Sequence, residues 1–202
     1  LYVEDLHGGG HHSDIYTTTV PKGKGATTLW PMGWHQGRLV LSVWTACTFE
    51  PLQSPNAWHV VDAATGIRTA SIGDANCIPG AWPSPAGIAC AVVNPGQINS
   101  QVNVYDWNGA LINSVRTQSG ANELSPSGDL LSIGYLFGPG SPSTTIIKIS
   151  DGTAVTVSGH LACQWIDDSH VLAGDAVIAY PSGSVAPIGH GGVCAGRFPG
   201  SL

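Results

Sequence analysis

The sequence is poor in charged side chains, and positive charge is the scarcer kind. Lysine and arginine together number 7 in 202 residues, against 13 aspartates and glutamates, and the formal net charge is −6. The basic residues are scattered singly along the chain. A surface that binds nucleic acid or an anionic membrane needs a cluster of them. We therefore expect neither of these partners.

Long apolar runs and long helix-forming runs are also missing. No apolar run approaches the ~18 residues that a membrane-spanning helix requires. Stretches rich in Ala, Leu, Glu and Lys, which are typical of helices, do not occur, whereas the chain holds 27 glycines and 14 prolines. The sequence therefore predicts an all-β protein that is dense in turns and has no membrane span.

The motifs of familiar catalytic and metal sites are absent as well. The chain has no Gly-x-Ser-x-Gly, no His-Glu-x-x-His, no Cys-x-x-Cys and no aspartate-rich calcium loop. Glutamate is scarce, whereas glycoside cleavage needs two carboxylates that face one bond. The string His-Gly-Gly-Gly at 7–10 lacks the strand, serine and helix of an esterase. We assign no catalytic residue and no cofactor.

What the sequence does have is a strand-turn-strand pattern that recurs. Residues 58–72 read as two short strands joined by a tight turn, in which Gly66 supplies a positive φ. Copies occupy 14–29, 102–115, 144–157 and 176–188. The turn glycines are spaced by 43, 43, 43 and 31 residues and are Gly23, Gly66, Gly109, Gly152 and Gly183. A second series of turns lies out of phase with the first, so each repeat of about 40 residues contains four strands.

The turn motifs resemble those of a known superfamily of propeller repeats. VVDAATG, VYDWNG, KISDG and IAYPSG are similar to the Asp-Gly turns between the third and fourth strands of TolB-like, YVTN and quinoprotein-type blades. The resemblance covers the whole chain and implies a β-propeller of four-stranded antiparallel blades. That superfamily spans enzymes, sensors and scaffolds, so the resemblance implies no particular activity.

The two ends of the chain predict the number of blades. Residues 193–198 look like an inner strand with no second strand after it, and residues 1–6 look like a second strand with no first. We predict a single domain, 1–202, that forms a five-bladed propeller whose seam blade is closed by both termini. The blades are 192–202 with 1–29, 30–72, 73–115, 116–157 and 158–191. The alternative is a fragment of a six- or seven-bladed propeller.

The two ends of the predicted blades differ in character. One end, the turn face, carries the two series of tight turns. The other end, the loop face, carries the connections between blades and the loops between second and third strands, and five of the eight histidines fall there. Neutral imidazole is a common metal ligand and a ready polar contact. The predicted ligand-binding residues on this face are His7, His11, His12, His160, His190, Trp34 and Glu123.

The histidines and tryptophans of the chain also suit roles outside a binding site. Histidine is a common residue in polar glycine-rich loops and need not bind a ligand there. A metal ion bound by the loop-face histidines is an alternative to a binding site without a metal. Most of the seven tryptophans are expected to fill the space between blades, because stacked sheets need large side chains there. Trp30 or Trp34 at the channel mouth is instead able to stack on a sugar ring.

The five cysteines of this acidic chain favour an oxidising compartment. Cys47 and Cys77 are expected to reach the loop face on neighbouring blades and to pair. Cys163 and Cys194 stand at matching heights on adjacent inner strands and form the second candidate disulfide. Cys90, in the middle of a second strand, is expected to remain a buried free thiol. The alternative is that all five are buried and reduced.

These features together predict a secreted or extracytoplasmic propeller that binds or senses a partner protein or a small polar ligand on its loop face. Because Leu1 is not an initiator methionine, we expect a mature or excised form. One alternative is a hydrolase-like or lactonase-like enzyme, or a sugar-binding propeller, with its site at the channel mouth. Another is a structural subunit, which a large repeated subunit contact would indicate.

Overall fold

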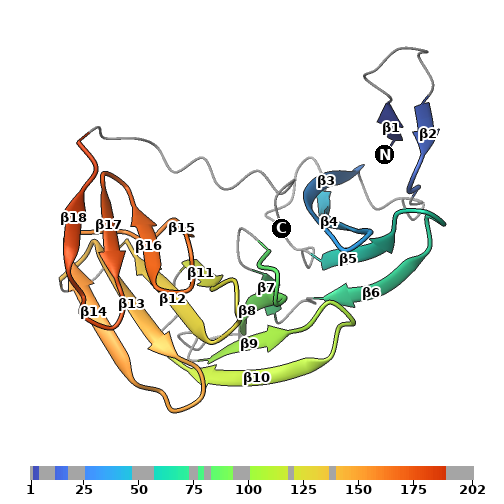
Figure 1. The fold of residues 1–202 in the computed structure, drawn as a ribbon. Coiled ribbons are helices and arrows are strands. Elements are labelled where there is room, and N and C mark those ends of the chain that lie inside the picture. The colour runs from blue at the N-terminus through green and yellow to red at the C-terminus, as the bar shows by residue number, and fades with distance from the viewer. Residues whose placement is uncertain are drawn as a thin grey trace.

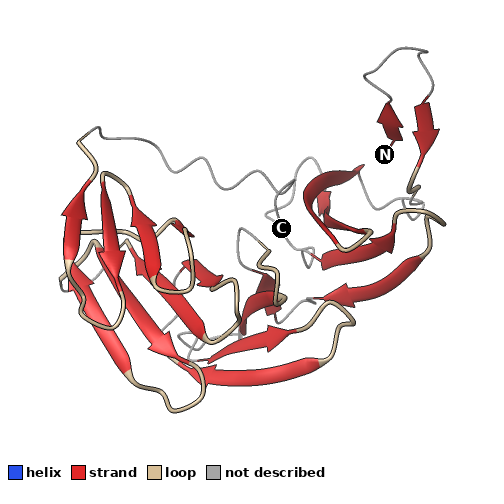
Figure 2. Cartoon of the chain, viewed as in Figure 1, coloured by secondary structure: helices blue, strands red, loops and turns tan. Residues whose placement is uncertain are grey.

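A computed structural model of the chain describes most of its length. The described residues are 2–4, 12–17, 26–46, 57–72, 77–79, 83–92, 101–117, 121–136 and 140–189. Every regular element among them is a β-strand (Figure 2). The predicted all-β class is confirmed.

Sixteen of the strands form four antiparallel sheets of four strands each. The first sheet contains β3 (Ala26–His35), β4 (Arg38–Ala46), β5 (Ala57–Asp62) and β6 (Arg68–Ile72). The second contains β7 (Cys77–Pro79), β8 (Ile88–Val92), β9 (Gln101–Tyr105) and β10 (Leu111–Arg116). The third contains β11 (Ala121–Leu124), β12 (Leu130–Tyr135), β13 (Ser143–Lys148) and β14 (Ala154–Ser158). The fourth contains β15 (Gln164–Trp165), β16 (His170–Ala173), β17 (Ala176–Ala179) and β18 (Val185–Pro187).

Each sheet is a simple meander in which every strand pairs with the next along the chain. This is the strand order that the repeat pattern predicts for a propeller blade. The sheets follow one another along an arc, from β3–β6 at one end to β15–β18 at the other (Figure 1). The structure thus contains four sheets of the propeller-blade type, while the fifth blade and closure of the ring stay predictions.

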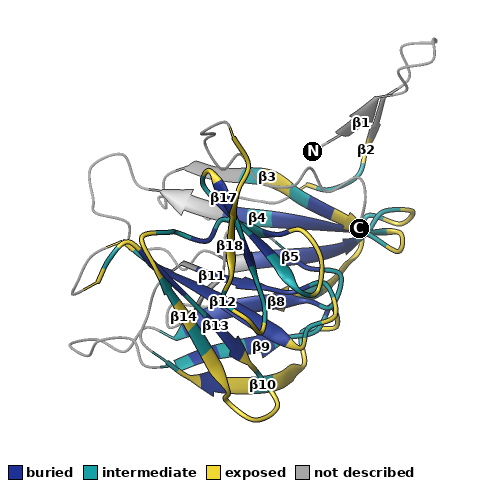
Figure 3. Cartoon of the chain, turned by 60° about the vertical axis from the view of Figure 1, so that its left-hand side comes forward, coloured by how far each residue is buried: buried dark blue, intermediate teal, exposed yellow. Residues whose placement is uncertain are grey.

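Apolar side chains from facing sheets make the core. Val40 and Val60 of the first sheet pack with Ile88 of the second. Val104 of the second packs with Leu131 of the third, and one further cluster of this kind joins the third sheet to the fourth. Strands β8 and β12 are therefore buried on both faces, whereas β10, β14 and β18 at the outer edge carry exposed residues (Figure 3).

Three tryptophans occupy these contacts between sheets, as the sequence predicts. Trp58 and Trp107 are buried between the first and second sheets, and Trp165 is buried between the third and fourth. Trp30 and Trp34 differ from these three, because 62% of the surface of Trp30 and 43% of the surface of Trp34 is exposed.

The N-terminal residues form a separate pair of strands. β1 (Tyr2–Glu4) pairs antiparallel with β2 (His12–Asp14) and lies beyond the first sheet in Figure 1. The sequence predicts instead that 1–6 pair on one side with the strand that ends at Phe198, which lies outside the described residues, and on the other with a strand around 15–20. That partner is wrong, because the described residues 15–17 are not in a strand. Ile15 and Tyr16 pack as side chains on the outer face of the first sheet.

The first repeat also differs from its prediction. Residues 26–29 are expected to be the fourth strand of the seam blade, and 28–34 a connection between blades. Both segments lie within the single strand β3. The apparent break at Pro31 is a β-bulge, because Pro31 pairs with Leu41 and Gly33 with Val40, which leaves Met32 as the extra residue. A bulge on an inner edge strand accommodates a proline that has no N–H to donate.

The turn between third and fourth strands repeats as predicted. Its glycine has φ values of 69°, 81°, 75° and 69° at Gly66, Gly109, Gly152 and Gly183. In the first sheet the Asp62 carboxylate closes the turn by accepting the Thr65 N–H at 2.8 Å and the Ala64 N–H at 3.1 Å. The hydrogen bond from the Thr65 hydroxyl and these backbone bonds lower the pKa of Asp62. The aspartate is therefore part of the turn.

Hydrogen bonds also join the turns of neighbouring sheets. The Ser84 hydroxyl of the second sheet donates to the Ser125 carbonyl of the third at 2.8 Å. The Ser127 N–H of the third donates to the Asp168 carboxylate of the fourth at 2.6 Å. Arg38 of the first sheet donates to the Asn108 side chain of the second at 3.1 Å. The turn face is thus linked in series along the arc.

A pair of glycine substitutions tests the packing of the N-terminal segment. A Cβ on Gly66 would lie 2.5 Å from the Ile15 carbonyl oxygen, whereas a Cβ on Gly152 would meet nothing within 4 Å. Both glycines have a positive φ. We expect Gly152→Ala to lower the free energy of unfolding by about 1 kcal/mol and Gly66→Ala to lower it by about 2–4 kcal/mol. Urea denaturation of the two variants checks this difference, and equal losses would place Ile15 away from the turn.

Candidate functional site

The predicted ligand residue that the structure describes best is His160. It lies in the connection between β14 and β15 and is half-buried. Its carbonyl accepts a hydrogen bond of 2.8 Å from the Thr144 hydroxyl. The same hydroxyl oxygen accepts the Ala162 N–H at 2.6 Å. Thr144 is fully buried, so one buried side chain holds this connection of the loop face at two points.

The other predicted histidines are not brought together among the described residues. His7, His11 and His190 lie outside the described ranges. His12 begins β2, where it pairs with Glu4 of β1. The predicted grouping of histidines on the loop face therefore stays a prediction.

Glu123 lies in the core and does not line an open channel mouth. It is the third residue of β11, pairs with Ser132 of β12 and is 6% exposed. Its carbonyl accepts the Trp165 indole N–H at 3.0 Å. The sequence places Glu123 at the head of the inner strand, but the contact between the third and fourth sheets extends over that position. The expected position at the rim is wrong.

Trp34 lies at the opposite end of its sheet from the loop face. The loop end of the first sheet is marked by the pairing of Ala26 with Ala46. Only His35 separates Trp34 from the tight turn at Gln36–Gly37, which is at the other end of the sheet. The unbroken ten-residue strand β3 is the reason, because it carries Trp34 away from the position that a connection over 28–34 implies. The expected position of Trp34 on the rim is also wrong.

The cysteines give a mixed outcome. Cys90 and Cys163 are both disulfide-bonded, so the expected free thiol at Cys90 is wrong. Cys47 and Cys194 lie outside the described residues, and the pairs Cys47–Cys77 and Cys163–Cys194 stay predictions.

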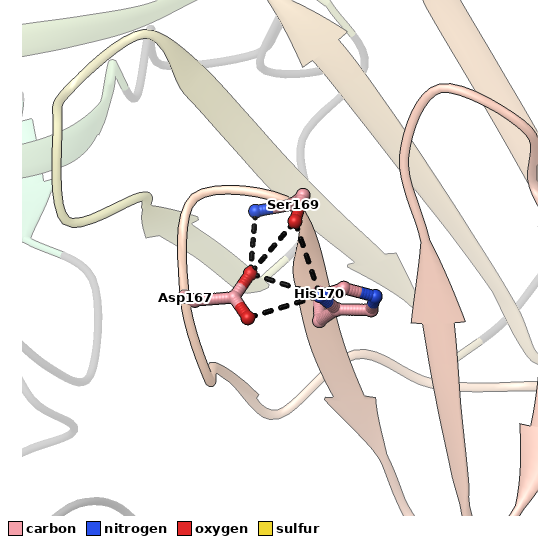
Figure 4. Close-up of polar contacts among 3 residues, drawn as sticks. All are labelled: Asp167, Ser169 and His170. Carbon is pink, nitrogen blue, oxygen red and sulfur yellow. Dashed lines mark hydrogen bonds and ion pairs between the residues drawn. The ribbon is translucent and has the colours of Figure 1, made fainter.

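The turn before β16 brings together three residue types of a hydrolytic triad (Figure 4). The Ser169 hydroxyl donates to the Asp167 carboxylate at 2.9 Å, and Nδ1 of His170 lies 3.0 Å from both carboxylate oxygens. The same Nδ1 lies 3.1 Å from the Ser169 hydroxyl. In a triad the histidine holds the acid with one ring nitrogen and the serine with the other.

Here one nitrogen faces both partners, and the second ring nitrogen points away from them (Figure 4). The serine donates to the Asp167 carboxylate, whose lowered pKa makes it a weak base, so the imidazole is not aligned to remove the serine proton. The Ser169 N–H also donates to Asp167 at 2.7 Å, and this bond is the main cause of the lowered pKa of that carboxyl group. The geometry thus closes a turn and does not activate a nucleophile.

A second group that the sequence does not reveal surrounds His59. The Tyr16 hydroxyl lies 2.8 Å from Nδ1 of His59, and the two rings meet edge to face with centroids 5.9 Å apart. Nη1 of Arg68 lies 3.4 Å from Nε2 of the same ring. Burial, followed by the positive charge of Arg68, lowers the pKa of His59 to about 4. No sequence signal joins these positions, because 43 residues separate Tyr16 from His59.

Two classes of site find no support in the part of the chain that the structure describes. Within it, no group of three or more His, Cys, Asp or Glu side chains is placed to hold a metal ion. No helix among the described residues has the length and apolar character needed to cross a membrane.

The anchor of the His160 connection can be tested with two threonines of the same strand. Thr144→Val keeps the shape of the side chain but removes both hydrogen bonds, which leaves the buried Ala162 N–H without an acceptor. We expect a loss of about 1–3 kcal/mol in the free energy of unfolding and faster amide exchange at Ala162. Thr145, whose hydroxyl meets that of Thr156 at the surface, provides the control. Thr145→Val should stay within about 0.5 kcal/mol of the parent, and equal effects would contradict the anchor.

Comparison with known proteins finds likeness at the level of structure. No family model matches the chain, and no curated protein matches its sequence. The β-propeller domain of the trilobed protease from Pyrococcus furiosus, described as having an open velcro topology, is similar over 82% of this chain and 57% of that domain, with a TM-score of 0.53 and 13% identity. The acylaminoacyl peptidase of Pyrococcus horikoshii is similar over 82% of this chain and 33% of that protein, with a TM-score of 0.50 and 10% identity.

This chain therefore spans less than two thirds of either structure that it resembles. At such low identity the likeness concerns the fold, and the type of blade is not distinguished. The four sheets of this chain are similar in structure to the β-propeller domains of these two proteins.

Proposed function

We propose that this chain is an extracytoplasmic binding module that engages a partner protein or a small polar ligand with its loop face. One observation carries the proposal. Most of the described carboxylates of the turn face are engaged in holding the turns, whereas the described connection of the loop face, over 158–163, is held by a buried threonine and carries a histidine. Rigid sheets that carry variable loops are a common arrangement for binding sites.

The aspartates of the turn face illustrate this engagement. Asp62, Asp106 and Asp151 each accept backbone N–H groups of their own turn at 2.8 Å. Asp167 does the same at 2.7 Å, and Asp168 accepts an N–H from the neighbouring sheet at 2.6 Å. A ligand that used these carboxylates would compete with the bonds that close the turns.

The support for the loop face is clearest at His160. Thr144 is buried and holds the backbone on both sides of Leu161, so the connection has a defined path. A binding residue on a fixed backbone loses little conformational entropy when a ligand arrives. Imidazole further provides a donor, an acceptor and a titratable charge in one side chain.

The cysteines support the proposal that the module is extracytoplasmic. Cys90 and Cys163 are disulfide-bonded, and disulfides persist mainly in oxidising compartments. The compartment also agrees with the net charge of −6 and the small number of lysines.

The same proposal includes a fifth blade at the seam. On the fourth sheet the strand register aligns Gln164, Leu172, Val177 and Ala186 on the face turned away from the third sheet. These four residues are half-buried or exposed, whereas Val171 and Ile178 on the opposite face are fully buried. Sheets in this architecture bury both faces, so a further blade against this face would complete the core.

A fourfold alanine variant tests the binding site. Replacing His11, His12, His160 and His190 together should abolish binding and leave the melting temperature within about 2 °C of the parent, because loop side chains contribute little to the core. Affinity of the parent should depend on pH, because an imidazole that gains a proton exchanges a hydrogen-bond acceptor for a charged donor. The measurement is isothermal titration with peptides selected on the parent from a random library, and with a panel of free monosaccharides.

The control variant carries four alanines away from the loop face, at Thr69, Ser114, Thr156 and Ser182, all of which are exposed. It should bind as the parent does. Full binding by the histidine variant would place the site elsewhere, with the loop over 45–57 as the next candidate. Binding lost only in the control would place it on the outer strands.

Removal of residues 1–6 tests the seam blade. If β1 belongs to a closed fifth blade, its loss should lower the free energy of unfolding by about 3 kcal/mol or more, because neighbouring strands lose their partner and their apolar cover. If β1 pairs with β2 alone, the loss should be small. Thermal unfolding followed by circular dichroism distinguishes the two, and a melting temperature within one or two degrees of the parent would rule out the seam blade.

A further inference from the structure

The segment over residues 12–17 covers one face of the first sheet. Ile15 and Tyr16 pack against Leu39, Leu41 and Val61, which are all nearly or fully buried. These three side chains belong to the face of the sheet that is turned away from the second sheet, since Val40 and Val60 on the other face make that contact. The segment is therefore the described cover of an apolar surface at one end of the arc.

One polar contact fastens this cover to the sheet. The Tyr16 hydroxyl meets Nδ1 of His59 at 2.8 Å, and the rings meet at an interplanar angle of 87°. His59 lies in β5 opposite Leu41 and is 8% exposed. Tyr16 of the segment thus both covers the His59 ring and forms a polar contact with it.

The groups that face His59 disfavour a positive charge on it. Arg68 of β6 lies 3.4 Å from Nε2, the segment contributes the neutral Tyr16, and β4 contributes the apolar Leu41. No carboxylate among the described residues is paired with this ring. A proton added to His59 would therefore sit beside a guanidinium and away from water.

We propose that residues 12–17 form an acid-sensitive latch, which is held on the first sheet by neutral His59 and released when that imidazole is protonated. Release lets water reach the new charge. It also uncovers Leu39, Leu41 and Val61, so exposure of one apolar sheet face depends on pH.

The direction follows from linkage between protonation and opening. With the latch closed, burial and Arg68 lower the pKa of His59 to about 4, against an ordinary value of 6.5. Above pH 6.5 the free-energy difference that favours the closed latch has its full value. It decreases as the pH falls toward 4, because His59 binds a proton more tightly in the open form than in the closed form. At pH 4.5 the closed-form pKa and the ordinary pKa of His59 allow the equilibrium constant for opening to rise by at most about eightyfold. We expect a rise of at least about tenfold.

Hydrogen exchange of the full chain at pH 7.5 and pH 4.5 tests the latch. After correction for the intrinsic exchange rate, protection of the amides over 12–17 should fall by about tenfold or more at the lower pH. Protection in β12 and β13 should fall by less than about threefold, since the third sheet does not contact the latch. Binding of a fluorescent apolar dye should rise over the same interval.

His59→Gln should remove this pH dependence, because glutamine keeps polar atoms in place but does not titrate. His12→Gln and His170→Gln are the matched controls, one within the segment and one on the fourth sheet, and both should keep it. Arg68→Gln should reduce it by removing the neighbouring charge. Full pH dependence in His59→Gln, its loss in either control, or an equal fall in the third sheet would overturn the proposal.

A reciprocal measurement covers the case in which His59→Gln loosens the segment at every pH. Tyr16→Ala opens the latch and leaves His59 in place, so the NMR titration midpoint of His59 should rise from about 4 toward 6.5, by about one unit or more. Tyr16→Phe keeps the ring contact and should give a smaller rise. An unchanged midpoint in Tyr16→Ala would show that the segment and His59 are not coupled, and would refute the latch.

Discussion

Contact between neighbouring sheets is the constraint on which the rest of this structure depends. No sheet of four short strands can bury enough apolar surface alone, so each one needs a neighbour on both faces. Val40, Val104 and Leu131 lie in clusters that are shared by two sheets. Because the core belongs to pairs of sheets, the arc is stabilised blade by blade, and its ends are the places where an apolar face requires some other cover.

The two ends of the arc meet this requirement differently in the described residues. At the first sheet, Ile15 and Tyr16 lie on the outer face and shield Leu39 and Leu41. At the fourth sheet, Leu172 on the outer face is only half-buried. A polar partner, His59, is used at the covered end, and a buried imidazole makes that cover dependent on protonation.

Under the proposed function, the turn face holds the fold and the loop face carries the binding site. On the turn face the aspartates, serines and glycines hold tight turns and link adjacent sheets, as in the bond from Ser127 to Asp168. The same logic explains why Asp167, Ser169 and His170 gather without forming a triad: their spacing is that of a turn, and one ring nitrogen serves both partners. On the loop face, the Thr144 hydroxyl supports the backbone of His160 by donating to its carbonyl.

The sequence by itself determined most of the strands, their order and the tight turns, because these depend on local signals: glycines such as Gly66 and Gly152, aspartates such as Asp62, and alternating apolar residues. Strand β3 and the partner of β1 were the exceptions. The sequence could not place Glu123 or Trp34, since burial of the first depends on the fourth sheet and the position of the second on strand β3, which runs unbroken through 28–34. The pairing of Tyr16 with His59 was equally beyond it. Only tertiary structure decided these positions, because each one depends on which sheet face lies opposite, and neither residue type nor spacing encodes that contact.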